Sequence, residues 1–341
     1  MKKLKCGVIG CGRIGCGFDE ILSRTLIRTH ALSYYKNPKS ELVALCDIDK
    51  KKLEYYGKKY KIEKVYENSK DMFEDQKLDC VSICTTANEH FKLVKEAIKN
   101  DVKGIIIEKP ISNSLDSAEK IIKLCKKSNV VLAVNHQRRF DPFYHLLSKL
   151  INQKKNGNVQ NVNVYYGGGI ANSGSHIYDV LRFFFGDVKS LNANVSLNSS
   201  NNMQDPNYDV KIQFKNKIRC NLVGINFKNY GIAEIDILFA KKRFSIDLVT
   251  NQVKIFEVLS RVQDYKLLQL SKQLKGKRPA TDIRLVIENF INCVQTRKNP
   301  FCTGYDGYKS LELVVGSILS AKSRRELQIP FKNKNYKIES R

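Results

Sequence analysis

The sequence predicts an α/β protein of two domains: a doubly wound parallel domain at residues 1–137 and an α+β domain at residues 138–341 with an open, mainly antiparallel sheet. Three observations carry this prediction. A chain of 341 residues is long enough to bury two cores. Up to about residue 137, short apolar runs alternate with helical patterns, which is typical of βαβ units. From about Val159 the runs lengthen and alternate apolar with polar residues, which is typical of an antiparallel sheet.

Five apolar runs in the first domain are predicted to be strands. Between them, residues 89–99 and 114–127 place apolar side chains at helical spacing, so consecutive strands are predicted to be parallel. The predicted strands are LKCGVIG (4–10), LVALCD (42–47), LDCVSICTT (78–86), VKGIIIEKP (102–110) and VVLAVNHQ (130–137).

The second domain combines strands of alternating polarity with closing helices. The helices are predicted at 282–296 and 305–323, where they can also pack back on the first domain, and a short apolar LQIPF and a polar tail follow. A turn-rich connection, SLNSSNNMQDPN, surrounds Ser199, and no internal repeat is present. The predicted strands are VNVYYGG (162–168), YDVKIQFKN (208–216), KIRCNLVGINF (217–227) and AEIDILFAKKRFSIDL (233–248).

Composition argues for an ordinary globular protein. Hydrophobic residues make up 42% and charged residues 27% of the chain, which disfavours disorder. No apolar run approaches the roughly 20 residues that a membrane helix requires, so we predict a cytoplasmic protein with no membrane partner. The ten cysteines include five in strand-like segments, where a thiol acts as a small hydrophobe, and their spacing predicts no metal site. These five are Cys6, Cys46, Cys80, Cys84 and Cys220.

The formal net charge of +25 favours an anionic partner, either a nucleic acid or a phosphorylated small molecule. The lysines are scattered through every segment, and no zinc finger, RNP strand or glycine-lysine phosphate loop accompanies them. We therefore predict no nucleic-acid partner.

The first motif with chemistry is Gly10-Cys11-Gly12-Arg13-Ile14-Gly15, directly after the first predicted strand. In a G-x-G-x-x-G turn the first glycine permits the turn, the second lets the backbone approach a pyrophosphate, and the third allows close packing of strand and helix. The phosphates then lie at a helix N-terminus, whose N–H groups favour an anion. The motif predicts a Rossmann domain that binds a dinucleotide.

Asp47 closes the second predicted strand, where a carboxylate can accept hydrogen bonds from the adenosine ribose. This favours NAD, with NADP as the alternative if Lys50 and Lys51 bind a 2′-phosphate. Asp47 can instead cap the helix that begins near Lys50. Its distance from the glycines exceeds the usual spacing of about 20 residues, which indicates an insertion, GFDEILSRTLIRTH at 17–30, that forms a loop over the cofactor or an extended helix start.

Polar residues also stand at the ends of the predicted strands LDCVSICTT and VKGIIIEKP, where open α/β sheets bind ligands. Behind a proline-rigidified turn, a lysine beside a nicotinamide can donate a hydrogen bond to a substrate oxygen. The predicted cofactor-binding residues here are Thr85, Thr86, Asn88, His90, Glu108 and Lys109.

GVIGCGRIG, Asp47, EKP and GGGIANSGSHIYDVLRFFFGD together resemble the glucose-fructose oxidoreductase and inositol dehydrogenase family, called Gfo/Idh/MocA. NHQRRFDPFY and the C-terminal PFCTGYDGYKSLELVVGSILSAKSRRELQIPF are also similar to that family. The resemblance implies a Rossmann domain, then an α+β domain whose open sheet forms homodimers or homotetramers, with substrate bound between the domains. It implies hydride transfer to or from a sugar, polyol or nucleotide-linked sugar, with surface-carbohydrate biosynthesis as one setting.

The resemblance also assigns catalytic roles. Family members use the EKP lysine, here Lys109, and a D-x-x-x-H pair, of which His176 is the histidine. Asn172 occupies the aspartate position, and an amide can orient a hydroxyl but cannot take a proton. We expect His176 to take the hydroxyl proton, Lys109 to polarise the same oxygen and Asp179 to support His176 or serve as an ordinary helix residue. The substitution at Asn172 keeps one alternative open, a non-catalytic dinucleotide-binding sensor or regulatory protein.

Arg138 and Arg139 follow the last predicted strand of the first domain, VVLAVNHQ. Adjacent arginines can bind a carboxylate or a diphosphate, so both are predicted substrate contacts. Because neighbouring side chains diverge, one of them is also a candidate for a salt bridge within the protein.

Overall fold

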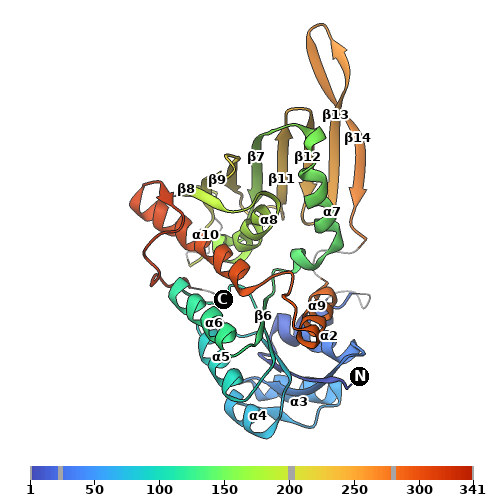
Figure 1. Cartoon of the computed structure of the whole chain (residues 1–341), viewed down its shortest axis with the longest axis vertical. Helices are drawn as coiled ribbons and strands as arrows, with labels where there is room; N and C mark the ends of the chain where they lie inside the picture. The colour runs from blue at the N-terminus through green and yellow to red at the C-terminus, as the bar shows by residue number, and fades with distance from the viewer. Residues whose placement is uncertain (1, 22–25, 199–203, 278–281, 340–341) are drawn as a thin grey trace. The chain divides into compact units, whose positions relative to one another are not determined.

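The computed structural model describes residues 2–21, 26–198, 204–277 and 282–339. The chain divides into two compact units (Figure 1). The first runs from the N-terminus to Phe140 and takes in Thr281–Tyr308, and the second comprises Asp141–Ala280 and Lys309–Glu339. The helix at 283–296 therefore belongs to the first unit although it follows the second domain's strands in the sequence.

The first unit contains a six-stranded parallel sheet in the order β3-β2-β1-β4-β5-β6, which is the Rossmann order and confirms the predicted fold class. All five predicted strands are present, and a two-residue β3 joins them. The strands are β1 (Leu4–Ile9), β2 (Ser40–Cys46), β3 (Val65–Tyr66), β4 (Cys80–Ile83), β5 (Gly104–Ile107) and β6 (Val131–Val134).

The helices of this unit begin where polar caps and apolar periodicity direct them. Ser114 accepts a hydrogen bond from the backbone N–H of Ser117 and starts α6, while Asn68 accepts from Asp71 and starts α4. Helix α9 packs against α2 and against β5 and β6. The helices are α1 (Phe18–Ile21), α2 (His30–Lys36), α3 (Lys50–Tyr60), α4 (Ser69–Asp75), α5 (His90–Lys99), α6 (Leu115–Lys127) and α9 (Ile283–Thr296), with short turns at η1 (Arg13–Gly17) and η2 (Gln137–Phe140).

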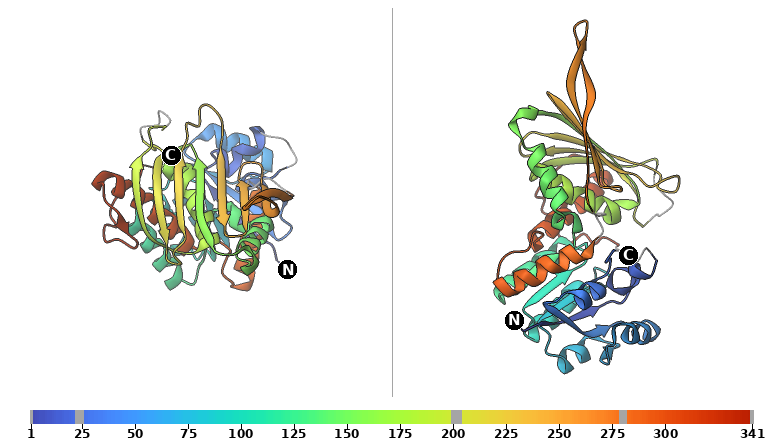
Figure 2. Two further views of the ribbon diagram at one scale, coloured as in Figure 1. Left: turned by 90° about the horizontal axis from the view of Figure 1, so that it is seen from above. Right: turned by 90° about the vertical axis from the view of Figure 1, so that its right-hand side faces the viewer.

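The second unit contains a nine-stranded sheet in the order β14-β13-β12-β11-β7-β10-β9-β8-β15, in which only the β10–β7 pair is parallel. Residues of β9 alternate between buried and exposed, so one face of the sheet carries the core. Helices α7 and α8 lie against that sheet (Figure 2). The strands are β7 (Val159–Tyr166), β8 (Val188–Val195), β9 (Tyr208–Phe214), β10 (Arg219–Gly224), β11 (Ala233–Phe239), β12 (Lys242–Asp247), β13 (Gln252–Val262), β14 (Tyr265–Lys275) and β15 (Leu327–Gln328).

The remaining elements of the second unit connect these strands. The predicted turn-rich connection around Ser199 lies partly outside the described residues. The β13–β14 hairpin, which the strand prediction did not include, extends beyond the rest of its sheet, and β14 is exposed at nearly every position (Figure 1). Within the described ranges, no helix combines the length and apolar character that a membrane crossing requires. The other elements are α7 (Pro142–Ile151), η3 (Lys154–Asn156), η4 (Gly169–Gly174), α8 (Ser175–Phe185) and α10 (Gly304–Ser323), whose first turn lies in the first unit.

Candidate active site

The glycine turn after β1 has no room for a side chain at Gly10 or Gly15 but has open space at Gly12. Gly10 has φ +93°, and a Cβ there would lie 2.7 Å from the carbonyl oxygen of Cys84. A Cβ on Gly15 would lie 1.9 Å from the carbonyl oxygen of Gly10, so strand and helix approach too closely for any side chain. A Cβ on Gly12 would meet nothing within 4 Å. The turn therefore offers open space at the one glycine where a pyrophosphate would approach the backbone.

A π-helical turn, η1, follows Gly12 and includes Arg13, which is exposed, and Ile14, which is half-buried. The N–H groups of Cys16 and Gly17 both donate to the Gly12 carbonyl at 3.0 Å. The N–H groups that precede them have no acceptor within their own helical turn, as at any helix start. These groups and the open Gly12 fit the phosphates of a dinucleotide.

Asp47 follows β2 and holds the glycine turn from the side. Its Oδ2 accepts the Cys11 N–H at 2.6 Å, and its Oδ1 accepts the Asp49 N–H at 2.9 Å. The helix α3 is capped by Asp49, which accepts from Lys51 and Lys52 at 3.0 and 3.3 Å. The alternative that Asp47 caps this helix is therefore wrong, because the carboxylate two residues later occupies the capping position.

Ile48 is a feature of this region that the sequence analysis missed. Its side chain is 90% exposed at the end of β2, directly beside Asp47. The only sequence signal was an isoleucine after the strand's closing carboxylate, where a polar residue would be ordinary. Of the two lysines proposed to bind a 2′-phosphate, Lys50 and Lys51, Lys50 forms an ion pair with Glu67 at 3.0 Å.

The insertion after Gly15 folds back on itself where it is described. It contains the short helix α1, then residues 22–25 outside the described range, and it ends in α2. The carboxylate of Asp19 accepts hydrogen bonds from the Arg28 N–H at 2.7 Å and from the Thr29 hydroxyl. Thr29 in turn caps α2 by accepting from Leu32 at 3.3 Å. The described part of the insertion is thus helical at its start, in α1, and irregular at residues 26–29, before α2 begins at His30.

The loop after β4 presents Thr85, half-buried, and Thr86 and Asn88, both exposed. His90 differs from these residues: it is 1% exposed, and its two ring nitrogens lie 3.1 Å from the carbonyl oxygens of Thr85 and Ile111. Burial lowers the pKa of this imidazole, although the two carbonyl groups and Glu108 act in the opposite direction. His90 therefore joins the loops after β4 and β5, and the prediction of a direct cofactor contact is corrected to this supporting role.

Lys109 follows β5 and is half-buried, on a turn that continues through the cis Lys109–Pro110 peptide bond. The preceding residue, Glu108, is 8% exposed and accepts hydrogen bonds from His30 Nε2 at 2.9 Å and from Asn135 Nδ2 at 2.5 Å. Burial alone raises the pKa of this carboxyl, but His30, Asn135 and the charge of Lys109 outweigh burial and hold the pKa below its ordinary value. Glu108 is thus a buried anion that anchors the lysine turn, rather than a ligand contact.

The first unit gathers the predicted cofactor residues at one edge of its sheet. Adjacent strands β2, β1, β4 and β5 end at Asp47, the glycine turn, the Thr85 loop and the Lys109 turn. A Cβ on Gly10 would lie 3.1 Å from the backbone nitrogen of Thr85, which shows how closely two of these loops approach. This is the carboxyl edge, where doubly wound sheets bind ligands.

In the second unit, β7 leads into a second glycine-rich turn. Gly168 and Gly169 have φ values of +85° and +90°. The carboxylate of Asp205 accepts the N–H groups of Ala171 at 2.8 Å and Asn172 at 2.9 Å. The sequence analysis missed Asp205, whose only signal was its position in the turn-rich MQDPN segment. This carboxylate fixes the backbone that carries Asn172.

His176 is the second residue of α8 and is half-buried, while Asn172 is exposed on the turn just before that helix. The Asn172 amide nitrogen donates to the Gly168 carbonyl at 3.4 Å, a contact that the family's aspartate would not make because a carboxylate has no donor. Asp179 lies three residues after His176 and is 1% exposed. This spacing puts the two residues on neighbouring positions of one helix surface.

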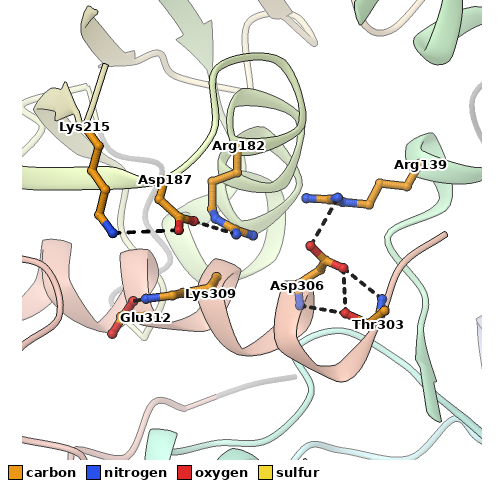
Figure 3. Close-up of polar contacts among 8 residues, drawn as sticks. All are labelled: Arg139, Arg182, Asp187, Lys215, Thr303, Asp306, Lys309 and Glu312. Atoms are coloured by element: carbon orange, nitrogen blue, oxygen red, sulfur yellow. Dashed lines mark hydrogen bonds and ion pairs between the residues drawn. The ribbon is translucent and has the colours of Figure 1, made fainter. Parts of the chain in front are cut away.

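Arg139 is an ion-pair partner within the first unit. It is 8% exposed, and its Nη1 lies 3.2 Å from the carboxylate of Asp306 (Figure 3). The same carboxylate accepts the N–H and hydroxyl of Thr303 at 2.9 and 2.7 Å, which starts helix α10. The substrate contact predicted for Arg139 is replaced by this buried pair, whereas Arg138 is half-buried in η2.

A separate charged cluster closes the far end of α8 in the second unit. Arg182 Nη2 donates to Asp187 at 2.9 Å, and Lys215 Nζ lies 3.9 Å from that carboxylate (Figure 3). Burial raises the pKa of Asp187, but the hydrogen bond and charge of Arg182 outweigh it and lower the pKa. Gly186, with φ +82°, lets the chain turn between them. The helix that begins near His176 is thus anchored at its C-terminal end.

Comparisons with known proteins agree with this geometry. Residues 4–136 match the model described as "Oxidoreductase family, NAD-binding Rossmann fold", and residues 160–329 match "Oxidoreductase family, C-terminal alpha/beta domain". D-apiose dehydrogenase of Paraburkholderia graminis is 24% identical over 96% of this chain and 90% of that protein. The scyllo-inositol 2-dehydrogenase (NAD(+)) of Bacillus subtilis is 23% identical over 86% of this chain and 90% of its own.

The fold has also been solved in related proteins. The WlbA dehydrogenase from Bordetella pertussis, in complex with NADH and UDP-GlcNAcA, superposes with a TM-score of 0.77 at 19% identity, covering 97% of this chain and 100% of that one. The fold and the glycine turn thus define an NAD-binding oxidoreductase. The chain belongs to the Gfo/Idh/MocA family, as its sequence motifs predict.

Proposed function

We propose that this enzyme is an NAD-dependent dehydrogenase that oxidises or forms a hydroxyl group on a sugar, polyol or nucleotide-linked sugar. Asp47 favours NAD over NADP, because its carboxylate accepts hydrogen bonds from ribose hydroxyls and repels a 2′-phosphate. Ile48 offers an apolar side chain to the adenine ring next to that ribose, and Thr85, Thr86 and Asn88 lie beyond the glycine turn as further contacts.

The open space at Gly12 is the observation that carries the proposal. A backbone turn that is open at Gly12, at the start of a helical turn and flanked by a carboxylate, suits a pyrophosphate joined to a ribose. NAD, when bound, accepts or supplies the hydride at C4 of its nicotinamide.

The protein's own side chains supply proton transfer and the orientation of the substrate. In the oxidation direction, His176 takes the proton of the substrate hydroxyl, and Lys109 donates a hydrogen bond to the same oxygen. Asn172 orients the substrate through its amide, and Asp179 supports His176 from the same helix surface. In the reverse direction His176 returns the proton to the carbonyl oxygen.

A finer proposal concerns the substrate and the assembly. The net charge of +25 favours substrates that carry phosphate, so nucleotide-linked sugars of surface-carbohydrate biosynthesis come first, with Arg138 as a diphosphate contact. The bound UDP-GlcNAcA of the WlbA structure supports the same class. We also propose a homodimer or homotetramer formed through the open sheet of the second unit.

The test is to follow nicotinamide absorbance with NAD and NADP while sugars, inositols and nucleotide-linked sugars are screened. With the best substrate, Lys109→Ala and His176→Asn each lower kcat about 10²- to 10⁴-fold, the usual contribution of a positioned acid-base group. Lys99→Ala, an exposed lysine, and His145→Asn, on α7, serve as matched controls and keep the parental rate.

Parental turnover in both Lys109→Ala and His176→Asn would disprove the catalytic assignment and leave cofactor binding intact. Nicotinamide fluorescence on the same variants separates the two conclusions, since neither change touches the glycine turn. A loss confined to nucleotide-linked sugars in Arg138→Ala would support the finer substrate proposal.

A further inference from the structure

A buried chain of polar side chains crosses the first unit and ends behind Lys109. Tyr34 Oη lies 2.8 Å from Ser82 Oγ, and Ser82 Oγ lies 2.9 Å from His30 Nδ1. On the other side of the imidazole, His30 Nε2 lies 2.9 Å from Glu108 Oε1, which also accepts from Asn135. None of these five residues is more than 8% exposed. The proposed chemistry uses none of them directly.

The inserted segment delivers the central residue of this chain. His30 is the first residue of α2, which Thr29 caps and Asp19 ties back to the start of the insertion. Tyr34 lies four residues later on the same helix surface, so one helix supplies both ends of the His30–Ser82–Tyr34 contact. Ser82 comes from β4, and Glu108 follows β5.

The donor at the Glu108 end of this chain can be assigned. An ionised Glu108 carboxylate only accepts, so His30 Nε2 must carry a hydrogen. At the other end of the chain the Ser82 hydroxyl donates to Tyr34 Oη, and His30 Nδ1 lies 2.9 Å from the Ser82 oxygen. Burial raises the pKa of Tyr34, so the phenol keeps its proton. Hydrogen bonds thus link Tyr34, Ser82, His30 and Glu108 without a break.

We propose that His30 is a positioning residue for the dehydrogenase: by donating to Glu108 it keeps that carboxylate ionised and fixed, and so holds the Lys109 turn that follows it. The inference rests on the role proposed above for Lys109. Its physical basis is that a buried carboxylate takes up a proton more readily when it loses one of its donors, and a neutral Glu108 no longer stabilises the neighbouring positive charge.

Other ionisable groups act on Glu108 as well. Lys109 lowers the pKa of Glu108, and the negative charge of Glu108 contributes to the raised pKa of the buried Cys84 thiol. Burial lowers the pKa of His90, against the attraction of Glu108. Cys84 and His90 therefore stay neutral near neutral pH, and the charged partner of Glu108 that matters for the reaction is Lys109.

Two substitutions test the two ring nitrogens of His30 separately. His30→Asn keeps a carboxamide near Nδ1, within reach of Ser82, but removes the His30 donor and leaves Glu108 with the Asn135 amide. His30→Gln extends a carboxamide to the Nε2 end and keeps a donor to Glu108. Both variants remove the ring and leave a buried amide, so we expect similar losses in the free energy of unfolding. Thermal melting of both variants checks that match.

We expect His30→Gln to stay within about threefold of the parental kcat, and His30→Asn to lose on the order of tenfold to a hundredfold, the cost of a displaced catalytic group. The acid limb of the kcat–pH profile moves to higher pH only in His30→Asn, because loss of the donor raises the pKa of Glu108. The KM for substrate and the dissociation constant for NADH change by less than about threefold in both variants, because binding groups are untouched. Equal losses in the two variants with unchanged pH profiles would overturn the inference.

A second measurement needs neither substrate nor cofactor. The chain has five histidines, so histidine-selective ¹⁵N NMR resolves His30, assigned by the signal missing from His30→Gln. The expected spectrum shows hydrogen on Nε2 throughout neutral pH, and hydrogen on Nδ1 alone would overturn the inference. A full rate in Lys109→Ala would instead refute the proposed role of Lys109, so the two failures are distinguishable.

Discussion

Two glycine-rich turns of this protein look alike in the sequence but differ in the space around their glycines. One joins β1 to η1 through Gly10, Gly12 and Gly15, and the other joins β7 to α8 through Gly168 and Gly169. Both follow a strand, both contain a π-helical turn, and both are held by an aspartate carboxylate that accepts backbone N–H groups. In the first turn that carboxylate belongs to Asp47, and in the second it belongs to Asp205.

The difference lies at the central glycines. A Cβ on Gly12 would meet nothing within 4 Å, whereas a Cβ on Gly169 would lie 2.1 Å from the Asp205 carboxylate. Asp47 takes up one N–H of its turn from the side, while Asp205 takes up two at the place where an external anion would otherwise bind. The first turn therefore keeps its backbone available for a ligand, and the second uses its backbone to position Asn172 and His176.

Replacing Gly169 by alanine gives the largest expected effect of this comparison. The change forces a side chain into φ +90° and into the Asp205 carboxylate, so the free energy of unfolding should fall by on the order of 3 kcal/mol. Urea unfolding measures the loss. Gly231→Ala is the control in the same unit, because its Cβ would only reach ordinary contact with Phe227 at 3.4 Å. Equal stabilities of the two variants would show that the Asp205 contact does not restrict the turn.

Replacing Gly12 by alanine should separate binding from stability. Gly12 has φ −69°, which alanine adopts readily, so unfolding free energy should stay the same or rise by roughly 0.4–1 kcal/mol. The new methyl group occupies the open space, and NADH affinity, measured by nicotinamide fluorescence, should fall at least about tenfold, or 1.4 kcal/mol. Gly15→Ala, whose Cβ would lie 1.9 Å from the Gly10 carbonyl, should instead lose stability. Parental NADH affinity in Gly12→Ala would remove the main support for the proposed cofactor site.

The sequence was most informative where the site is built from neighbouring residues. The glycine spacing, the closing Asp47 and the EKP turn are local patterns, and the strand ends that carry them lie at one edge because parallel strands share direction.

The remaining features depend on contacts between distant residues. Asp205 lies 34 residues from Ala171, and His30 lies 78 residues from Glu108, so no local pattern reveals either hydrogen bond. From the sequence Arg139 was predicted to bind a ligand, and the structure shows that it forms an ion pair with Asp306. The β13–β14 hairpin was missed for another reason: exposed apolar residues blur the alternation that marks a strand with one buried face.

The smallest expected effect tests the two carboxylates themselves. Asp47→Asn removes the negative charge beside the ribose site but keeps an oxygen that can accept the Cys11 N–H. The preference for NADH over NADPH should therefore fall by about fivefold, because a charge at about 4 Å in a hydrated site contributes about 1 kcal/mol. Asp205→Asn is the matched control: it should leave that preference unchanged and lower the free energy of unfolding by about 1 kcal/mol, since one amide oxygen replaces two carboxylate acceptors. Fluorescence titration with NADH and NADPH gives the ratio of the two dissociation constants. An equal change of that ratio in Asp205→Asn would contradict the assignment of cofactor binding to the first turn and a structural role to the second.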